Sequence, residues 1–127
     1  MAFPTHFSLH ELIYTNTGLQ NLPNVTQEKN LLFVAHTLEQ IRSTLNKPIY
    51  ITSGFRSKNV NKCVGGSDTS LHLAGLAVDI SIANYSYTQL PLLIKAILDT
   101  HPYELYPISH SALHISWYRS NDCFTNF

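Results

Sequence analysis

The sequence predicts an α+β fold in which N-terminal helices pack on a small, mainly antiparallel sheet. Apolar residues recur at helical spacing in the first third of the chain, and short runs of strand type follow in the remainder. The chain has 127 residues, of which 44% are hydrophobic and 13% are charged. This length and composition predict a single domain over residues 1–127 with one hydrophobic core.

Two helices are expected before the first strand. The segment Phe7–Leu12 is typical of a helix start, because Ser8 can cap it and Glu11 follows at capping-box spacing. After a loop over 16–23, a long amphipathic helix is expected from Thr26 until Pro48 ends it. Its apolar face would consist of Leu31, Val34, Leu38, Ile41 and Leu45.

The rest of the chain predicts short strands and one more helix. Strands are expected over 49–52, 76–81, 103–106 and 112–117, the third with the weakest pattern. A helix is expected over 88–98, with Pro91 in its first turn, where a missing N–H is tolerated. Between the first two strands lies a long, polar, glycine-punctuated segment that is expected to be a loop.

Alternation along two of these strands places a carboxylate and an imidazole opposite the core. If Leu76, Val78 and Ile80 face the core, Asp79 faces away from it between two small residues. By the same alternation, His114 faces away from the core on the last strand.

A third metal-binding side chain, His72, lies just upstream of Asp79 in a turn that Gly75 bounds. Three nitrogen or oxygen ligands with a fourth position left to water are typical of catalytic zinc, which lowers the pKa of its water from about 15.7 to roughly 7. Isolated residues of these types are more often hydrogen-bonded structural residues, so the spacing alone leaves both interpretations open.

The order of these residues resembles a known family. The residues that carry the resemblance are Ser53-Gly54-Phe55-Arg56-Ser57, Asn61, Val64-Gly65-Gly66, Ser70-x-His72-x-x-Gly75-x-Ala77-x-Asp79-Ile80 and His114-Ile115-Ser116. The family is that of the zinc D-Ala-D-Ala carboxypeptidases, which includes small phage endolysin-type peptidases that share the fold of hedgehog signalling domains. Phage-type members are also similar at Phe7-Ser8-x-x-Glu11-Leu12, Asn21-x-Pro23, Ile41-Arg42 and Lys47-Pro48-Ile49.

The resemblance implies a role for each site residue. His72, Asp79 and His114 would be the zinc ligands. Arg56 would hold the scissile carbonyl and stabilise the developing oxyanion, a task that suits a fixed guanidinium. Ser70 would contact the substrate backbone, although a serine there can also cap a turn.

The sequence departs from the family at the general base. Many members carry Glu or Asp three residues before the last histidine, where this chain has Ser111. Glu104 or His110 could supply the base instead, and the sequence does not decide between them. A third interpretation is that the site catalyses poorly and mainly binds.

The function expected from the resemblance is zinc-dependent hydrolysis of peptide bonds in the peptidoglycan stem peptide or cross-link, by a phage lysis enzyme. The first alternative is a zinc-bearing domain that binds cell-wall peptide or a protein without cutting, and the second is a metal-free structural protein of a virion. The resemblance does not indicate which peptidoglycan bond is cut.

Composition excludes some classes of partner. The formal net charge is zero, which argues against nucleic-acid binding, and no apolar run is long enough for membrane insertion. No secretory signal is recognised, so we expect synthesis in the host cytoplasm, action on peptidoglycan after release or export, and a monomer. Cys63 and Cys123 are expected to be free thiols.

Overall fold

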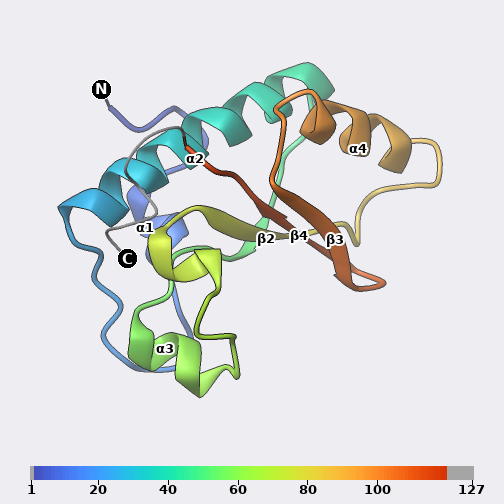
Figure 1. Ribbon diagram of the computed structural model, residues 1–127. Helices are drawn as coiled ribbons and strands as arrows, with labels where there is room; N and C mark the ends of the chain where they lie inside the picture. Colours follow the sequence, from blue (N-terminus) through green and yellow to red (C-terminus); the bar gives the residue numbers. More distant parts are fainter. Residues whose placement is uncertain (1, 120–127) are drawn as a thin grey trace.

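The computed structural model describes residues 2–119, which form one four-stranded sheet with helices on both sides (Figure 1). The elements follow in the order α1 (Leu9–Ile13), α2 (Val25–Leu45), β1 (Ile51–Ser53), α3 (Lys58–Cys63), the 3₁₀ helix η1 (Leu71–Ala74), β2 (Ala77–Ser81), α4 (Leu90–Leu98), β3 (Glu104–Ser109) and β4 (Ala112–Ser116).

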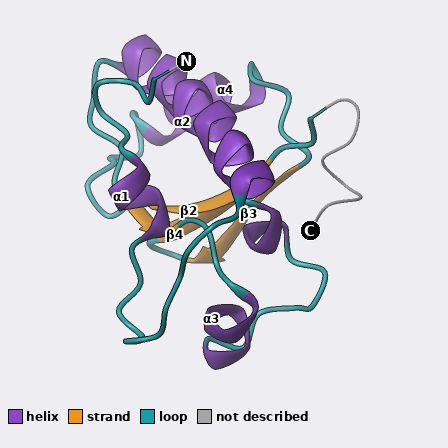
Figure 2. Ribbon diagram, turned by 90° about the vertical axis from the view of Figure 1, so that its left-hand side faces the viewer, coloured by secondary structure: helices purple, strands orange, loops and turns teal. Residues whose placement is uncertain are grey.

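The sheet is antiparallel throughout, with the strand order β1-β2-β4-β3. Helices α2 and α4 lie together on one side of it, and α3 lies on the other side (Figures 1 and 2). This arrangement confirms the predicted α+β class. It also leaves β3 as an edge strand, and Pro107, which has no N–H, lies within that strand.

The starts of the first two helices follow from side-chain caps. The capping box of Ser8 and Glu11 is present at α1 as predicted. Helix α2 begins at Val25, slightly earlier than expected, because Asn24 and Gln27 form a second capping box. It ends before Pro48, at Asn46, which adopts the left-handed conformation with φ 50°.

The core lies between α2, α4 and one face of the sheet. Leu31, Val34 and Leu38 of α2 are fully buried there. The predicted core residues of the two central strands are also buried: Leu76, Val78, Ile80, Leu113, Ile115 and Trp117. Each face of the sheet therefore carries the residues that the alternation predicted.

The segment expected to be a loop after the first strand contains two short helices, which is a correction to the prediction. Ser57 caps α3 and Ser70 caps η1, each with its hydroxyl accepting a backbone N–H. Neither helix is long enough to show an apolar period, so the pattern could not reveal them. Gly75 ends η1 with φ 74°, and a Cβ there would lie 2.7 Å from the backbone oxygen of Gln27. The glycine thus lets the turn pack closely on α2.

The helices and the cysteines were also the subject of predictions. No helix within residues 2–119 is long and apolar enough to cross a membrane. Cys63 is an exposed free thiol, as predicted, whereas Cys123 lies outside the described residues.

Candidate metal centre

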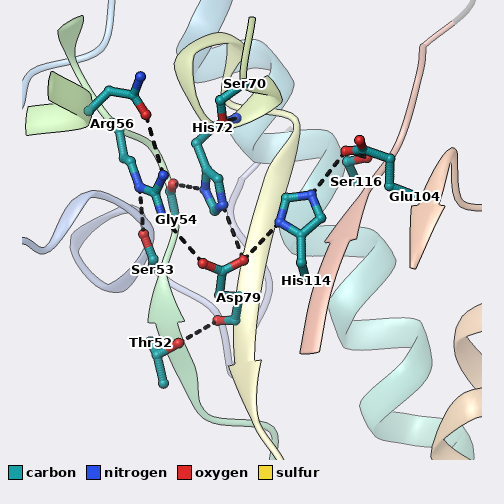
Figure 3. A network of polar contacts seen from close by, with 11 residues as sticks. Thr52, Ser53, Gly54, Arg56, Ser70, His72, Asp79, Glu104, His114 and Ser116 are labelled. Atoms are coloured by element: carbon teal, nitrogen blue, oxygen red, sulfur yellow. Dashed lines mark hydrogen bonds and ion pairs between the residues drawn. The ribbon is translucent and has the colours of Figure 1, made fainter. Parts of the chain in front are cut away.

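Three side chains from separate parts of the chain meet on the sheet face opposite the helical core. Oδ1 of Asp79 lies 3.1 Å from Nε2 of His72 and 2.9 Å from Nδ1 of His114 (Figure 3). The ligand atoms of the three residues all lie within 4.8 Å of one another. Each residue is at most 5% exposed. The structure therefore brings together the three residues that the sequence singled out.

The register of β2 with β4 and the capped turn of η1 bring the three ligand side chains together. Asp79 of β2 and His114 of β4 are direct partners in the antiparallel pair, so their side chains emerge side by side. His72 reaches the same point from η1, whose first turn is fixed by the hydroxyl of Ser70. The carbonyl of His72 also accepts the backbone N–H of Arg56, which ties η1 to the segment between β1 and α3.

His72 is oriented by the backbone. Its Nδ1 lies 2.7 Å from the carbonyl oxygen of Gly54, and a carbonyl can only accept, so Nδ1 carries the proton. A Cβ on Gly54 would collide with the backbone oxygen of Leu12. Glycine is therefore needed for the close approach that places this carbonyl.

His114 is oriented by side chains. Its Nε2 lies 2.9 Å from Oε1 of Glu104, and the hydroxyl of Ser116 donates a 2.6 Å hydrogen bond to the same oxygen. Burial would raise the pKa of Glu104, but hydrogen bonds from Ser116 and His114 act together against it, and the pKa lies below its ordinary value. Tyr106 stacks on the ring face of His114, with centroids 4.6 Å apart and planes inclined by 26°.

The donor set fits a divalent cation. With their outer nitrogens protonated, neutral His72 and His114 both direct a lone pair toward the ionised Asp79. Three electron-rich atoms then converge on one point, which requires either extra protons or a metal ion between them. Two imidazoles and one carboxylate are ligands that Zn²⁺ accepts in sites that keep a position open.

The groups around the cluster shift the pKa values of Asp79 and His114. Burial would raise the pKa of Asp79, but hydrogen bonds with His114 and His72 outweigh it and hold that pKa well below its usual range. Burial would lower the pKa of His114, but hydrogen bonds with Asp79 and Glu104 raise it above the ordinary value. A metal ion therefore competes with a proton for His114.

Arg56 stands beside the cluster and is held on three sides. Its Nε donates to Ser53 at 3.1 Å, and its two terminal nitrogens donate to Asn61 and Asp79, each at 3.3 Å. A guanidinium has five N–H groups, so two of them make no hydrogen bond within residues 2–119. A Cβ on Gly66 would press against the side chains of Asn61 and Arg56, so glycine keeps this corner open.

The cluster lies at the floor of a cleft of about 310 Å³. Arg56, Ser70 and Glu104 line it, with Tyr106 and Ile108 of β3 forming one wall. His110 is not in this cleft, because it lies in the exposed turn between β3 and β4 beside a separate hollow near Tyr85. Ser70, which caps η1, also lines this cleft.

Three contributors were missed by sequence reasoning. Gly54 acts through its backbone carbonyl, which leaves no side-chain signal, and Ser116 was part of the family resemblance without a role of its own. Asn61 was part of the family resemblance, but its role as the buried support of Arg56 could not be read from its position. Gly54, Asn61 and Ser116 each hydrogen-bond to another residue of the site, namely His72, Arg56 and Glu104.

A buried His-Asp-His cluster at the floor of an open cleft is typical of a metal-dependent hydrolase. The model of one family, Peptidase M15, matches residues 5–116, and the chain belongs to that family. The chain is also similar to the zinc D-Ala-D-Ala carboxypeptidase of Streptomyces albus G, with 30% identity over 90 residues. That match covers 68% of this chain and 35% of the relative, so the chain spans about a third of the relative's length. The predicted family resemblance is confirmed.

Proposed function

We propose that this chain is a zinc-dependent peptidase that hydrolyses peptide bonds in the stem peptide or cross-link of bacterial peptidoglycan. The observation that carries the proposal is the convergence of His72, Asp79 and His114 at the floor of an open cleft. Membership of the Peptidase M15 family supports the reaction class, and the name of the Streptomyces relative supports the substrate class.

In this proposal the three residues hold Zn²⁺, which when bound polarises a carbonyl and activates water. Gly54 and Glu104 accept hydrogen bonds from the outer nitrogens of His72 and His114, so that the inner nitrogen of each ring faces Asp79. Arg56, fixed by three contacts, directs its remaining N–H groups toward the carbonyl oxygen on which negative charge develops. Ser70 contacts the substrate backbone from the cleft wall.

The sequence offers two candidates for the proton acceptor, Glu104 and His110. Of the two candidates, His110 lies outside the cleft, while Glu104 touches the cluster through the outer edge of His114. The family position for a carboxylate holds Ser111, which is exposed and hydrogen-bonded to Ser109. Asp79 and Glu104 are the carboxylates that line the cleft within the described residues.

We further propose that the peptidase serves phage lysis as an endolysin and reaches peptidoglycan after release or export from the host cytoplasm. The similarity of its N-terminal residues to phage-type members supports this setting. The test is expression of the chain in a bacterium whose membrane is then permeabilised. Lysis that follows permeabilisation and disappears in His72→Ala would support the proposal, and intact cells would contradict it.

Ser111 specifically favours a second candidate function, in which the domain binds cell-wall peptide and cuts it slowly or not at all. The two functions are separated by incubating zinc-loaded protein with purified peptidoglycan and searching for new amine and carboxyl ends by mass spectrometry. New ends that require zinc and are absent with Asp79→Asn would support hydrolysis and would also identify the bond. Co-sedimentation with peptidoglycan but no new ends would support binding.

A further inference from the structure

The carboxylate of Glu104 is committed to His114 on the side of the ring that faces away from Asp79. The two contacts of His114 lie at opposite edges of the imidazole, Nδ1 toward Asp79 and Nε2 toward Glu104 (Figure 3). The ring therefore stands between Glu104 and the point where the three ligand atoms converge. A general base must reach a proton at that point within hydrogen-bond distance.

Strand register fixes Glu104 in this place. Glu104 of β3 pairs directly with Ser116 of β4, and Tyr106 pairs with His114. Glu104 and His114 are thus diagonal neighbours on one face of the sheet, a spacing that long side chains can bridge. The fully buried hydroxyl of Ser116 donates to Oε1, the same oxygen that meets Nε2 of His114.

The hydrogen bond between Glu104 and His114 also selects the tautomer of the His114 imidazole. An ionised carboxylate can only accept hydrogen bonds, so Nε2 of His114 must carry a proton, and Nδ1 keeps its lone pair for a metal ion. Carboxylates behind metal-binding histidines raise the basicity of the ligand and fix its orientation. The ring of Tyr106 packs against the face of the His114 imidazole and also restricts its rotation.

We propose that Glu104 is a positioning residue, which holds His114 in the tautomer that binds zinc through Nδ1, and is not the base that accepts a proton from water. This inference rests on the proposed function as far as zinc is concerned. In this assignment both carboxylates of the cleft, Asp79 and Glu104, belong to the metal centre. Because Ser111 occupies the position where the family has a carboxylate, the described residues leave no free carboxylate in the cleft.

Two variants of Glu104 separate positioning from proton transfer. Glu104→Gln keeps an acceptor oxygen for His114 but cannot take up a proton, whereas Glu104→Ala removes the acceptor. Zinc affinity is measured by competition with a chromophoric chelator. We expect Glu104→Ala to bind zinc about 10- to 100-fold more weakly, and Glu104→Gln to lose much less, since a neutral hydrogen bond is weaker but present. Asp99→Ala, which removes an exposed carboxylate at the C-cap of α4, is the matched control and should bind like the wild type.

A readout without zinc tests the tautomer itself. Nitrogen-15 NMR of the imidazoles in the metal-free protein at mildly alkaline pH should show His114 protonated at Nε2 in the wild type and in Glu104→Gln. In Glu104→Ala the two tautomers should mix. The unchanged His72 signals show in the same spectrum that the variant is folded.

The results that would overturn the inference are distinct from those that would overturn the proposed function. If Glu104→Ala binds zinc as the wild type does, or its His114 tautomer is unchanged, Glu104 does not position the ring. If Glu104→Gln keeps its zinc affinity but hydrolyses peptidoglycan about 10²- to 10⁴-fold more slowly, Glu104 is the base. A wild-type protein that takes up no zinc would remove the proposed function, while the NMR result would still decide the role of Glu104.

Discussion

The two histidines of the metal centre are held in different ways on two sides of the site. On the β1 side, His72 is 2% exposed, and its acceptor is the backbone carbonyl of Gly54. On the β3 side, His114 depends on the side chains of Glu104 and Tyr106, which an edge strand carries. A backbone acceptor survives most substitutions, whereas a side-chain acceptor can be tuned by a single one. The β3 side is therefore where the affinity for metal can be adjusted without rebuilding the fold.

The largest effect is expected from removing a ligand on the β1 side. His72→Ala should lower zinc affinity by more than about 100-fold, because losing a ligand costs more than losing the group that orients it. Hydrolysis of peptidoglycan should disappear with the metal. Metal content after dialysis measures the first effect, and a thermal melt shows whether the chain remains folded. His10→Ala, an exposed histidine on α1, is the control. Full zinc content in His72→Ala would exclude His72 as a ligand.

The next effect tests the backbone support of His72. Gly54→Ala should destabilise the fold by about 1–3 kcal/mol, because the added methyl group meets the backbone of Leu12 and must displace it. Zinc affinity should fall as well, since the Gly54 carbonyl moves with that backbone. Gly18→Ala is a matched control, because it adds a methyl group in open space at φ 78° and should cost stability without affecting zinc. Equal zinc affinity in both variants would mean that the carbonyl of Gly54 does not matter.

The stability of the metal-free protein and its zinc affinity are expected to depend on pH through His114, on the β3 side. The pKa of His114 is raised above the ordinary 6.5. The contribution of protonated His114 to the stability of the metal-free protein is therefore complete below pH about 6.5. It is lost as the pH rises through the raised pKa of His114. Zinc competes with that proton, so apparent zinc affinity should increase with pH, with a midpoint above 6.5. Titrations of zinc binding at several pH values measure it, and a midpoint below the ordinary value would contradict the assignment.

The smallest effect is expected at the ring face of His114. Tyr106→Ala should weaken zinc binding only a few-fold, because an aromatic stacking contact contributes about 0.5–1.5 kcal/mol. Tyr106→Phe keeps the ring and should match the wild type in a chelator competition. A loss in Tyr106→Phe as large as in Tyr106→Ala would instead point to a role for the hydroxyl group.

The sequence predicted the faces of the central strands better than their ends. Alternation around Asp79 and His114 placed both on the face opposite the core, because the period of a strand is two wherever one face is buried. The first strand, expected over 49–52, begins at Ile51 instead, since pairing with Ile80 and Asp79 decides where it forms. Pairing partners are not visible in one segment taken alone.

The metal ligands were predictable, but most of their supports were not. His72, Asp79 and His114 are side chains of recognisable chemistry in a recognisable order. The contact of Glu104 with His114 depends on the register of β3 against β4, which no single strand pattern contains. The role of Gly54 depends on a backbone oxygen brought close by α1. Such contacts arise from tertiary packing, so sequence patterns do not reveal them.

Pro107 has a consequence for how this molecule meets other chains. An edge strand ordinarily presents a row of unpaired backbone N–H and C=O groups, with which another extended chain, including a second copy of the protein, can pair. The proline interrupts the row of N–H donors on β3 beside the exposed Tyr106 and Ile108. Self-association along this edge is thereby discouraged.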